Sequence, residues 1–356
     1  MSFVSAARLQ SLPRKSKVLV AVTDRVGDAL FRTPAIRILA RTYPHIRFDA
    51  LTFGKGAQTI LCQHPDVGCV HMHTHKRAIA ELAKNYDLVI NTRSSNVRRY
   101  LSKVQTPIIQ HRRIARQSHK AEDLLCFIQT LLPRHSALSP SDRTYVLPVD
   151  TGIHNRLKQR LEGQYSLNSQ EHKLIGLHLG CASIRKYKLF FSRQALVNHK
   201  KTWPVQRYIR LAQRLVNEDP ARRIVIIGSP EENFLCQHLV DQVPQAVDTC
   251  PDLSLLEMTA LIDRCELLIC NDSGPMHLAC ARQKPVLALF GPTIPQKTGP
   301  FPALPQFQTI KRDTMHQIEA EEVWAKAETL LEERSRDGFA DTGTQGGTYP
   351  QSTFPA

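Results

Sequence analysis

The stretch that decides the fold runs from Cys265 to Thr293 and reads CELLICNDSGPMHLACARQKPVLALFGPT. It contains two short apolar runs, 267–270 and 285–290, with the length and composition of fully buried strands. The polar and small residues 271–275 end the first strand, and a short helix rich in small residues follows them. Pro275 fits the first turn of that helix, because its missing N–H would have no partner there. This order predicts a parallel β-α-β unit.

Polar residues and glycines follow the ends of these two predicted strands. They are Asp272, Ser273, Gly274, His277, Gly291 and Thr293. Ligands of open α/β sheets bind at the carboxyl ends of strands, and helix N-termini there favour phosphates. Asp272 or Ser273 can also cap the helix. An ordinary β-α-β unit with a capped helix would look the same locally, so that plainer interpretation stays open.

Strand and helix patterns alternate along both halves of the 356-residue chain. This length predicts two domains, and the alternation predicts a doubly wound parallel sheet in each. We expect an N-terminal domain over 1–150, a linker with one helix over 151–172, a C-terminal domain over 173–335 and a disordered tail over 336–356. The predicted fold class is α/β, with two Rossmann-like domains facing across a cleft.

The formal net charge is +15, which indicates an anionic partner such as nucleic acid, a membrane face or a phosphorylated substrate. Aromatic residues make up only 6% of the chain, and we find no nucleic-acid-binding motif, so nucleic acid is not expected. The nine cysteines form no C-x-x-C pair and several lie in apolar runs, which favours a reducing compartment. We find neither a secretory signal nor an apolar stretch long enough to span a membrane. We therefore expect a cytoplasmic protein, peripheral on the inner membrane.

The segment D-S-G-P-M-H-L-A-x-A at 272–281, followed by P-V-L-A-L-F-G-P-T at 285–293, resembles the signature of glycosyltransferase family 9, the lipopolysaccharide heptosyltransferases. The segments G-D-x-x-x-x-x-P at 27–34 and K-x-W-P at 201–204 are similar to two further motifs of that family. The resemblance covers about residues 17–330. It implies a GT-B fold and inverting transfer of a sugar, heptose or another, to a lipopolysaccharide or related glycan. The implied donor is a nucleotide diphosphate sugar such as ADP-heptose.

The candidate catalytic residues are Asp28 and Lys201. From local sequence, Asp28 is a helix-capping carboxylate or a general base that takes the proton of the acceptor hydroxyl. The resemblance implies that it is the base. Most lysines are solvated surface charges. The resemblance implies that Lys201 instead stabilises the diphosphate leaving group, so no metal cofactor is expected. The insert 181–200 is longer than is common in the family, and one of its cations is the alternative to Lys201.

The resemblance also implies residues that bind the donor besides the strand-end residues of 272–293. Ser183 takes the place of a hydroxyl that contacts phosphate. A glutamate of the loop 228–232 bonds the nucleotide ribose, and Glu232 fits the spacing from Gly228 better than Glu231. The alternating histidines of 71–75 lack an obvious further ligand, so we expect no metal site.

A basic cluster that includes Arg112, Arg113 and Arg116 is the candidate binding site for the acceptor or a lipid headgroup. A run of charged residues is usually just a solvent-exposed surface. The sequence favours neither this interpretation nor a binding site. Two rival functions are a nucleotide-sugar epimerase of the same fold, which would need no lipid acceptor, and a non-catalytic basic module that binds a membrane or another anion.

Overall fold

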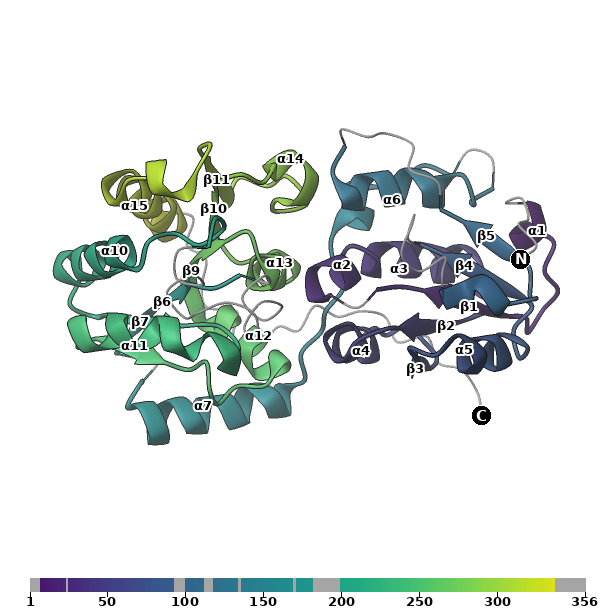
Figure 1. Ribbon diagram of the computed structural model, residues 1–356, viewed down its shortest axis with the longest axis horizontal. Coiled ribbons are helices and arrows are strands. Elements are labelled where there is room, and N and C mark those ends of the chain that lie inside the picture. Colours follow the sequence, from purple (N-terminus) through teal and green to yellow (C-terminus); the bar gives the residue numbers. More distant parts are fainter. Residues whose placement is uncertain are drawn as a thin grey trace. The chain divides into compact units, whose positions relative to one another are not determined.

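The computed structural model describes residues 7–23, 25–92, 100–111, 118–133, 136–168, 171–181 and 199–336. The chain forms two compact units, the first up to Pro148 and the second from Val149 on (Figure 1). Each unit contains one all-parallel sheet with helices between its strands, which confirms the predicted α/β class. No helix in these ranges is long and apolar enough to cross a membrane. The predicted tail lies outside the described residues from position 337 on.

The first unit is built on a five-stranded sheet with the order β3-β2-β1-β4-β5. Its strands are β1 (Lys17–Ala21), β2 (Arg47–Thr52), β3 (Val70–Met72), β4 (Leu88–Asn91) and β5 (Ile108–Gln110). Its α-helices are α1 (Ala7–Gln10), α2 (Val26–Leu30), α3 (Thr33–Thr42), α4 (Lys55–Cys62), α5 (Lys76–Ala83) and α6 (Lys120–Gln129). The central strand β1 is fully buried from Val18 to Ala21, as expected for a parallel strand that is covered on both faces.

The second unit is built on a six-stranded sheet with the order β11-β10-β9-β6-β7-β8. Its strands are β6 (Lys173–His178), β7 (Arg222–Ile226), β8 (Ala246–Asp248), β9 (Cys265–Asn271), β10 (Val286–Phe290) and β11 (Phe307–Lys311). Its α-helices are α7 (Thr151–Tyr165), α10 (Val205–Glu218), α11 (Asn233–Gln242), α12 (Leu255–Arg264), α13 (Gly274–Ala281), α14 (Pro295–Thr298) and α15 (Ala320–Arg336). The chain adds β7 and β8 on one side of β6 and the later strands on the other, so the strand order reverses between β6 and β9.

Helix α7 falls within the range expected for the linker, yet it belongs to the second unit. It packs against α12, and Arg160 Nη1 donates to Glu257 Oε1 at 3.0 Å. One turn later, the Tyr165 hydroxyl donates to Asp252 at 2.5 Å. The apolar stripe of α7 contains only three buried residues, Ile153, Leu157 and Leu161. This stripe is too sparse to reveal, from the sequence alone, that the helix packs on a domain.

His64 is buried in the first unit, and both of its ring nitrogens have backbone partners. Nδ1 accepts a hydrogen bond from the Asp66 N–H at 3.1 Å, so Nε2 carries the proton and donates to the Thr33 carbonyl at 2.9 Å. A second proton on Nδ1 would oppose the Asp66 N–H. Burial lowers the pKa of His64 to about 4, from its ordinary value of 6.5. The folded unit therefore requires the neutral imidazole.

We predict that the first unit keeps its full stability above pH about 6.5 and loses stability as the pH falls toward about 4, because only the unfolded chain takes up the proton readily. The loss should reach about 3 kcal/mol of unfolding free energy. Urea unfolding at several pH values measures it. His64→Asn should flatten the pH dependence, whereas the exposed control His75→Asn should not. Equal slopes in all three proteins would contradict this assignment.

Candidate functional site

The predicted donor-binding residues follow four neighbouring strands of the second sheet, β10, β9, β6 and β7. A glycine follows each of these strands within three residues, at positions 291, 274, 180 and 228. All four strands are parallel, so their loops meet at one edge of the sheet. The reversal of strand order between β6 and β9 marks this edge as a topological switch point, where open α/β sheets bind ligands.

Asn271, the last residue of β9, joins the end of that strand to the loop after β6 and to the start of α10. Its Nδ2 donates to the carbonyls of Leu179 and Gly180, at 2.8 and 3.1 Å. Its Oδ1 lies 3.1 Å from the Tyr208 hydroxyl and 3.3 Å from the Trp203 N–H, both donors. The side chain has no exposed surface. Sequence reasoning treated Asn271 only as the end of a strand, although an amide between an apolar run and Asp272 was an available signal.

Lys201 and Asp272, predicted separately, are in direct contact. Lys201 Nζ donates to Asp272 Oδ2 at 2.7 Å, and 27% and 11% of the two side chains are exposed. The position of the lysine is fixed by Trp203, which is a core residue. The Trp203 ring is 1% exposed, packs edge-on against Tyr208, and donates from Nε1 to the Ile318 carbonyl at 2.8 Å. Lys201 is therefore held beside the carboxyl end of β9.

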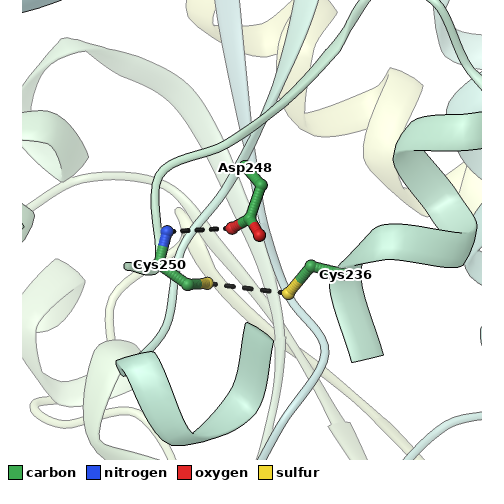
Figure 2. Close-up of side chains that lie close together, drawn as sticks. All are labelled: Cys236, Asp248 and Cys250. Atoms are coloured by element: carbon green, nitrogen blue, oxygen red, sulfur yellow. Dashed lines mark hydrogen bonds between the residues drawn. The ribbon is translucent and has the colours of Figure 1, made fainter. Parts of the chain in front are cut away.

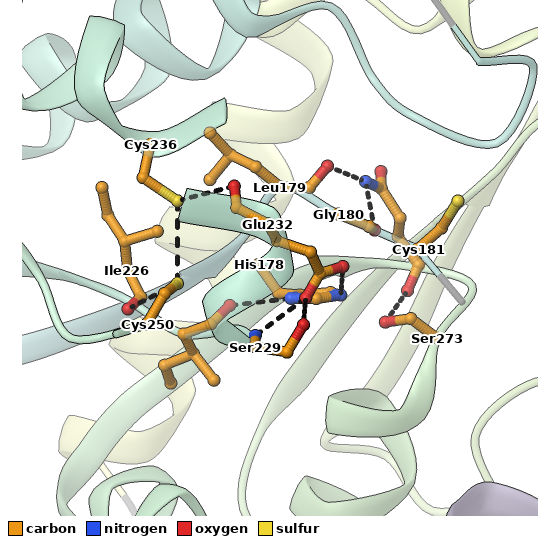
Figure 3. Close-up of polar contacts among 12 residues, drawn as sticks. His178, Leu179, Gly180, Cys181, Ile226, Ser229, Glu232, Cys236, Cys250 and Ser273 are labelled. Carbon is orange, nitrogen blue, oxygen red and sulfur yellow. Dashed lines mark hydrogen bonds and ion pairs between the residues drawn. The ribbon is translucent and has the colours of Figure 1, made fainter. Parts of the chain in front are cut away.

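Glu232 is the buried member of the two glutamates proposed for the loop after β7. Its Oε2 accepts hydrogen bonds from the Ser229 N–H at 2.9 Å and the Ser229 hydroxyl at 3.1 Å (Figure 3). Its Oε1 lies against the backbone of Gly180, where a Cβ atom would be only 1.8 Å away. Only glycine at position 180 leaves room for this carboxylate.

His178, the last residue of β6, is a neighbour of Glu232 that sequence reasoning missed. Its Nδ1 lies 2.7 Å from the Ile227 carbonyl and donates to it, so Nε2 carries no proton in the neutral ring. That Nε2 lies 3.9 Å from Glu232 Oε1 and has no hydrogen-bond partner among the described residues (Figure 3). The ring fills the space behind the carboxylate and limits where Oε1 can move.

The first turn of α13 has no side-chain cap, contrary to the expectation for Asp272 or Ser273. Asp272 pairs with Lys201 instead. Ser273 occupies the N-cap position, but its hydroxyl donates to the Asn271 carbonyl at 3.1 Å. Gly274 begins the helix, and His277 is buried in its first turn with 5% of its surface exposed. A helix start without a capping carboxylate or hydroxyl favours an external anion.

Gly291 and Thr293 lie farther from this centre, since β10 neighbours β9 and not β6. A Cβ atom at Gly291 would meet the backbone nitrogen of Met315 at 2.9 Å, and its carbonyl accepts from Lys311 Nζ at 2.7 Å. Packing against Met315 therefore explains this glycine without a ligand. Thr293 is half-buried.

Asp28 belongs to the first unit, in the first turn of α2. It is not the N-cap, because Arg25 occupies that position. Its carboxylate is 15% exposed, and Oδ1 lies 3.8 Å from both Arg32 Nη1 and Lys120 Nζ. The buried Arg32 also donates to the Thr92 carbonyl and hydroxyl, each at 3.4 Å. Asp28 therefore has two cationic neighbours, each at about the longest distance that still counts as an ion pair.

Four predicted site residues, Ser183, Arg112, Arg113 and Arg116, lie outside the described residues. The residue before the three arginines, His111, is not part of an exposed basic face. It is 7% exposed, and its Nε2 lies 3.2 Å from Asp123 Oδ2. Burial lowers its pKa, which favours the neutral ring.

Comparisons with known proteins agree on one family. The model of glycosyltransferase family 9 (heptosyltransferase) matches residues 141–327. The lipooligosaccharide heptosyltransferase 2 of Haemophilus influenzae is 34% identical over 105 residues, which are 28% of this chain and 30% of that protein. The lipopolysaccharide heptosyltransferase 1 of Pseudomonas aeruginosa is 25% identical over 314 residues, 80% of this chain and 81% of that protein. The first match thus spans less than a third of the relative's length.

A solved structure extends the likeness to the fold of nearly the whole chain. The structure of the ADP-heptose lipopolysaccharide heptosyltransferase II of Escherichia coli superposes with a TM-score of 0.68 at 20% identity. The superposition covers 90% of this chain and 99% of that one. At this identity the likeness concerns the fold alone.

We predict that Asn271→Ala lowers the free energy of unfolding of the second unit by about 1–3 kcal/mol, because it leaves buried carbonyls and donors without partners. Urea unfolding followed by circular dichroism measures the change. Asp272→Asn is the matched control at the next position. It weakens only a partly exposed ion pair and should cost less than about 1 kcal/mol. Equal decreases in unfolding free energy in the two variants would show that the Asn271 hydrogen bonds do not hold these segments together.

Proposed function

This chain belongs to glycosyltransferase family 9, whose model matches more than half of its length, and from that membership we propose its reaction. It transfers heptose, or a related sugar, from a nucleotide diphosphate donor to a lipopolysaccharide core or related glycan. The observation that carries the proposal is the Lys201–Asp272 contact at the switch point of the second sheet, with Glu232 across β6. This arrangement brings one cation and two carboxylates to the same edge of the sheet, which supports a donor site there.

The donor binds at this edge in our proposal. Glu232 Oε1 accepts a ribose hydroxyl, because Ser229 already engages the other oxygen. Lys201 and the uncapped start of α13 face the diphosphate, with Ser183 of the insert as a further phosphate contact assigned from the sequence. Ser273 and Gly274 form this helix start, and Asp272 and His277 line the sugar side. ADP is the nucleotide that the name of the E. coli neighbour suggests, and we carry it over as part of the proposal.

Transfer breaks the bond between the anomeric carbon and the diphosphate and forms a bond to the acceptor oxygen with inversion. Asp28 takes the proton of the acceptor hydroxyl. Lys201 stabilises the negative charge that develops on the leaving diphosphate. We therefore propose that no metal ion is needed at the reacting centre. Lys201 is preferred to a cation of the insert 181–200 because Trp203 holds its loop in place.

The acceptor is anionic in our proposal, which rests on the net charge of +15 and on the basic cluster with Arg112, Arg113 and Arg116. The same charge would hold the protein on an anionic membrane face, with no span through it. Gly291 and Thr293 are assigned to the donor site because they follow β10 at the same edge of the sheet, and the family resemblance implies the same assignment.

We predict that Asp28→Asn lowers kcat by about 10²–10⁴-fold, the usual cost of losing a general base. The variant keeps the size of the side chain, and Asp28 is not the N-cap, so thermal stability and donor affinity should change little. Steady-state kinetics with ADP-heptose and a truncated lipid-linked acceptor measure kcat, and calorimetry measures donor affinity. Turnover near the wild-type rate would exclude Asp28 as the base.

We predict that Gly180→Ala weakens donor binding by about 10–100-fold, because the new methyl group displaces the Glu232 carboxylate and its charge-assisted hydrogen bond. Calorimetric titration with ADP measures the change. The control is Gly163→Ala in α7, where a Cβ atom would meet nothing within 4 Å. Glu232→Gln should reproduce the effect of Gly180→Ala. If both variants bound ADP like the wild type, the ribose role of Glu232 would be wrong.

A further inference from the structure

Two buried cysteines and a carboxylate, those of Cys236, Cys250 and Asp248, lie close together (Figure 2). Cys236 lies on α11, Asp248 ends β8, and Cys250 follows two residues later. The two sulfur atoms are 3.6 Å apart, and Asp248 Oδ1 accepts a hydrogen bond from the Cys250 N–H at 2.9 Å. One ligand atom from each residue lies within 4.8 Å of the other two. Both cysteines are 1% exposed.

This group has acidic neighbours and no positive partner. Burial raises the pKa of Asp248, and the charge of the nearby Asp252 adds to the rise. Asp252 receives hydrogen bonds from the neutral side chains of Gln164 and Tyr165, at 2.9 and 2.5 Å. No Lys, Arg or His of the described ranges pairs with either carboxylate. The cluster offers ligand atoms for a cation, and no positively charged side chain of the described ranges pairs with its carboxylates.

We propose that Cys236, Cys250 and Asp248 bind one thiophilic divalent metal ion, with Zn²⁺ as the ion that this ligand set fits best. Tetrahedral zinc with Zn–S bonds of about 2.3 Å separates two thiolate sulfurs by about 3.8 Å. The observed 3.6 Å therefore needs only a small adjustment. Asp248 is half-buried, so water can reach the fourth position. Two backbone carbonyls also lie close by, Glu232 at 3.6 Å from Cys236 Sγ and Ile226 at 3.7 Å from Cys250 Sγ.

The ion would brace the Glu232 loop and take no part in sugar transfer. Cys236 lies one helical turn after Glu232 and contacts its carbonyl. On the other side, Cys250 Sγ lies 2.8 Å from where a Cβ atom of Gly228 would be. An ion on these sulfurs joins α11, β8 and the loop between β7 and α11 from behind (Figure 3). The inference stands on these residues alone and does not depend on the proposed reaction.

Binding must release thiol protons. The ion replaces those protons when it binds, and its apparent affinity should fall as the pH falls.

The test uses the full-length protein, reduced and freed of metal with a chelator, and Co²⁺ as an optical probe of the zinc site. We expect thiolate-to-cobalt charge-transfer absorbance and visible bands of four-coordinate cobalt that saturate at one equivalent and vanish when Zn²⁺ is added. Cys236→Ser and Cys250→Ser should abolish the charge-transfer band. Cys265→Ser and Cys270→Ser, which change buried cysteines outside the cluster, should keep it. Asp248→Asn should weaken cobalt binding by at least about 10-fold.

Several results would overturn the proposal. One is a reduced wild-type protein that shows no charge-transfer band at millimolar Co²⁺, and another is a band that survives in Cys236→Ser. A disulfide between the two cysteines in place of metal binding, detected by thiol counting, would also overturn it. If the serine variants fail to fold by circular dichroism, Asp248→Asn decides, since it keeps the acceptor for the Cys250 N–H. Unchanged cobalt affinity in that folded variant would reject the site.

Discussion

The four hydrogen bonds of the Asn271 amide are the interaction on which the second unit's ligand-binding edge depends. Where the parallel strands β6 and β9 end, their last carbonyls lose the partners that a continuing ladder would supply. The buried amide replaces those partners for Leu179 and Gly180, and with its oxygen it also holds Trp203 and Tyr208. The end of β9, the loop after β6 and the start of α10 are thereby held together, and Lys201 lies two residues before Trp203 in this arrangement.

The proposed general base Asp28 and the proposed donor-binding residue Asp272 have different charged neighbours. Asp272 is bound to a single lysine at 2.7 Å, whereas Asp28 stands 3.8 Å from each of two cations. If Lys201 serves a diphosphate, it must share or leave Asp272 when the donor arrives. A ligand with two phosphate groups can outcompete one carboxylate for an ammonium, while a neutral sugar cannot. The ion pair would then favour charged donors over free sugars.

Much of the fold could be predicted because its signals are local. Apolar runs such as 267–270 and 285–290 mark buried strands in any context, and their alternation with helices leads to parallel sheets. Helix α7 was the exception, because its apolar stripe is short and its place on the second unit rests on partners about 90 residues away, Asp252 and Glu257.

The candidate site could be predicted only in part. Family motifs pointed to Asp272, Lys201 and Glu232, but not to their contacts. The Lys201–Asp272 pair joins residues 71 positions apart, and the Asn271 bonds to β6 span 91 and 92 positions. No local pattern encodes such pairs. The same holds for Gly180, which must be glycine because of the Glu232 carboxylate that follows the next strand along the chain, β7.

Gly180 has a consequence for anyone who would redesign the nucleotide preference of this enzyme family member. The Glu232 carboxylate fits in its position only because residue 180 has no Cβ atom. The His178 ring lies on its other side. Side-chain libraries at 180 would therefore return mostly loss of function, whatever base or sugar is offered. If Glu232 binds the nucleotide as proposed, a side chain at 180 would change donor affinity through the position of this carboxylate alone.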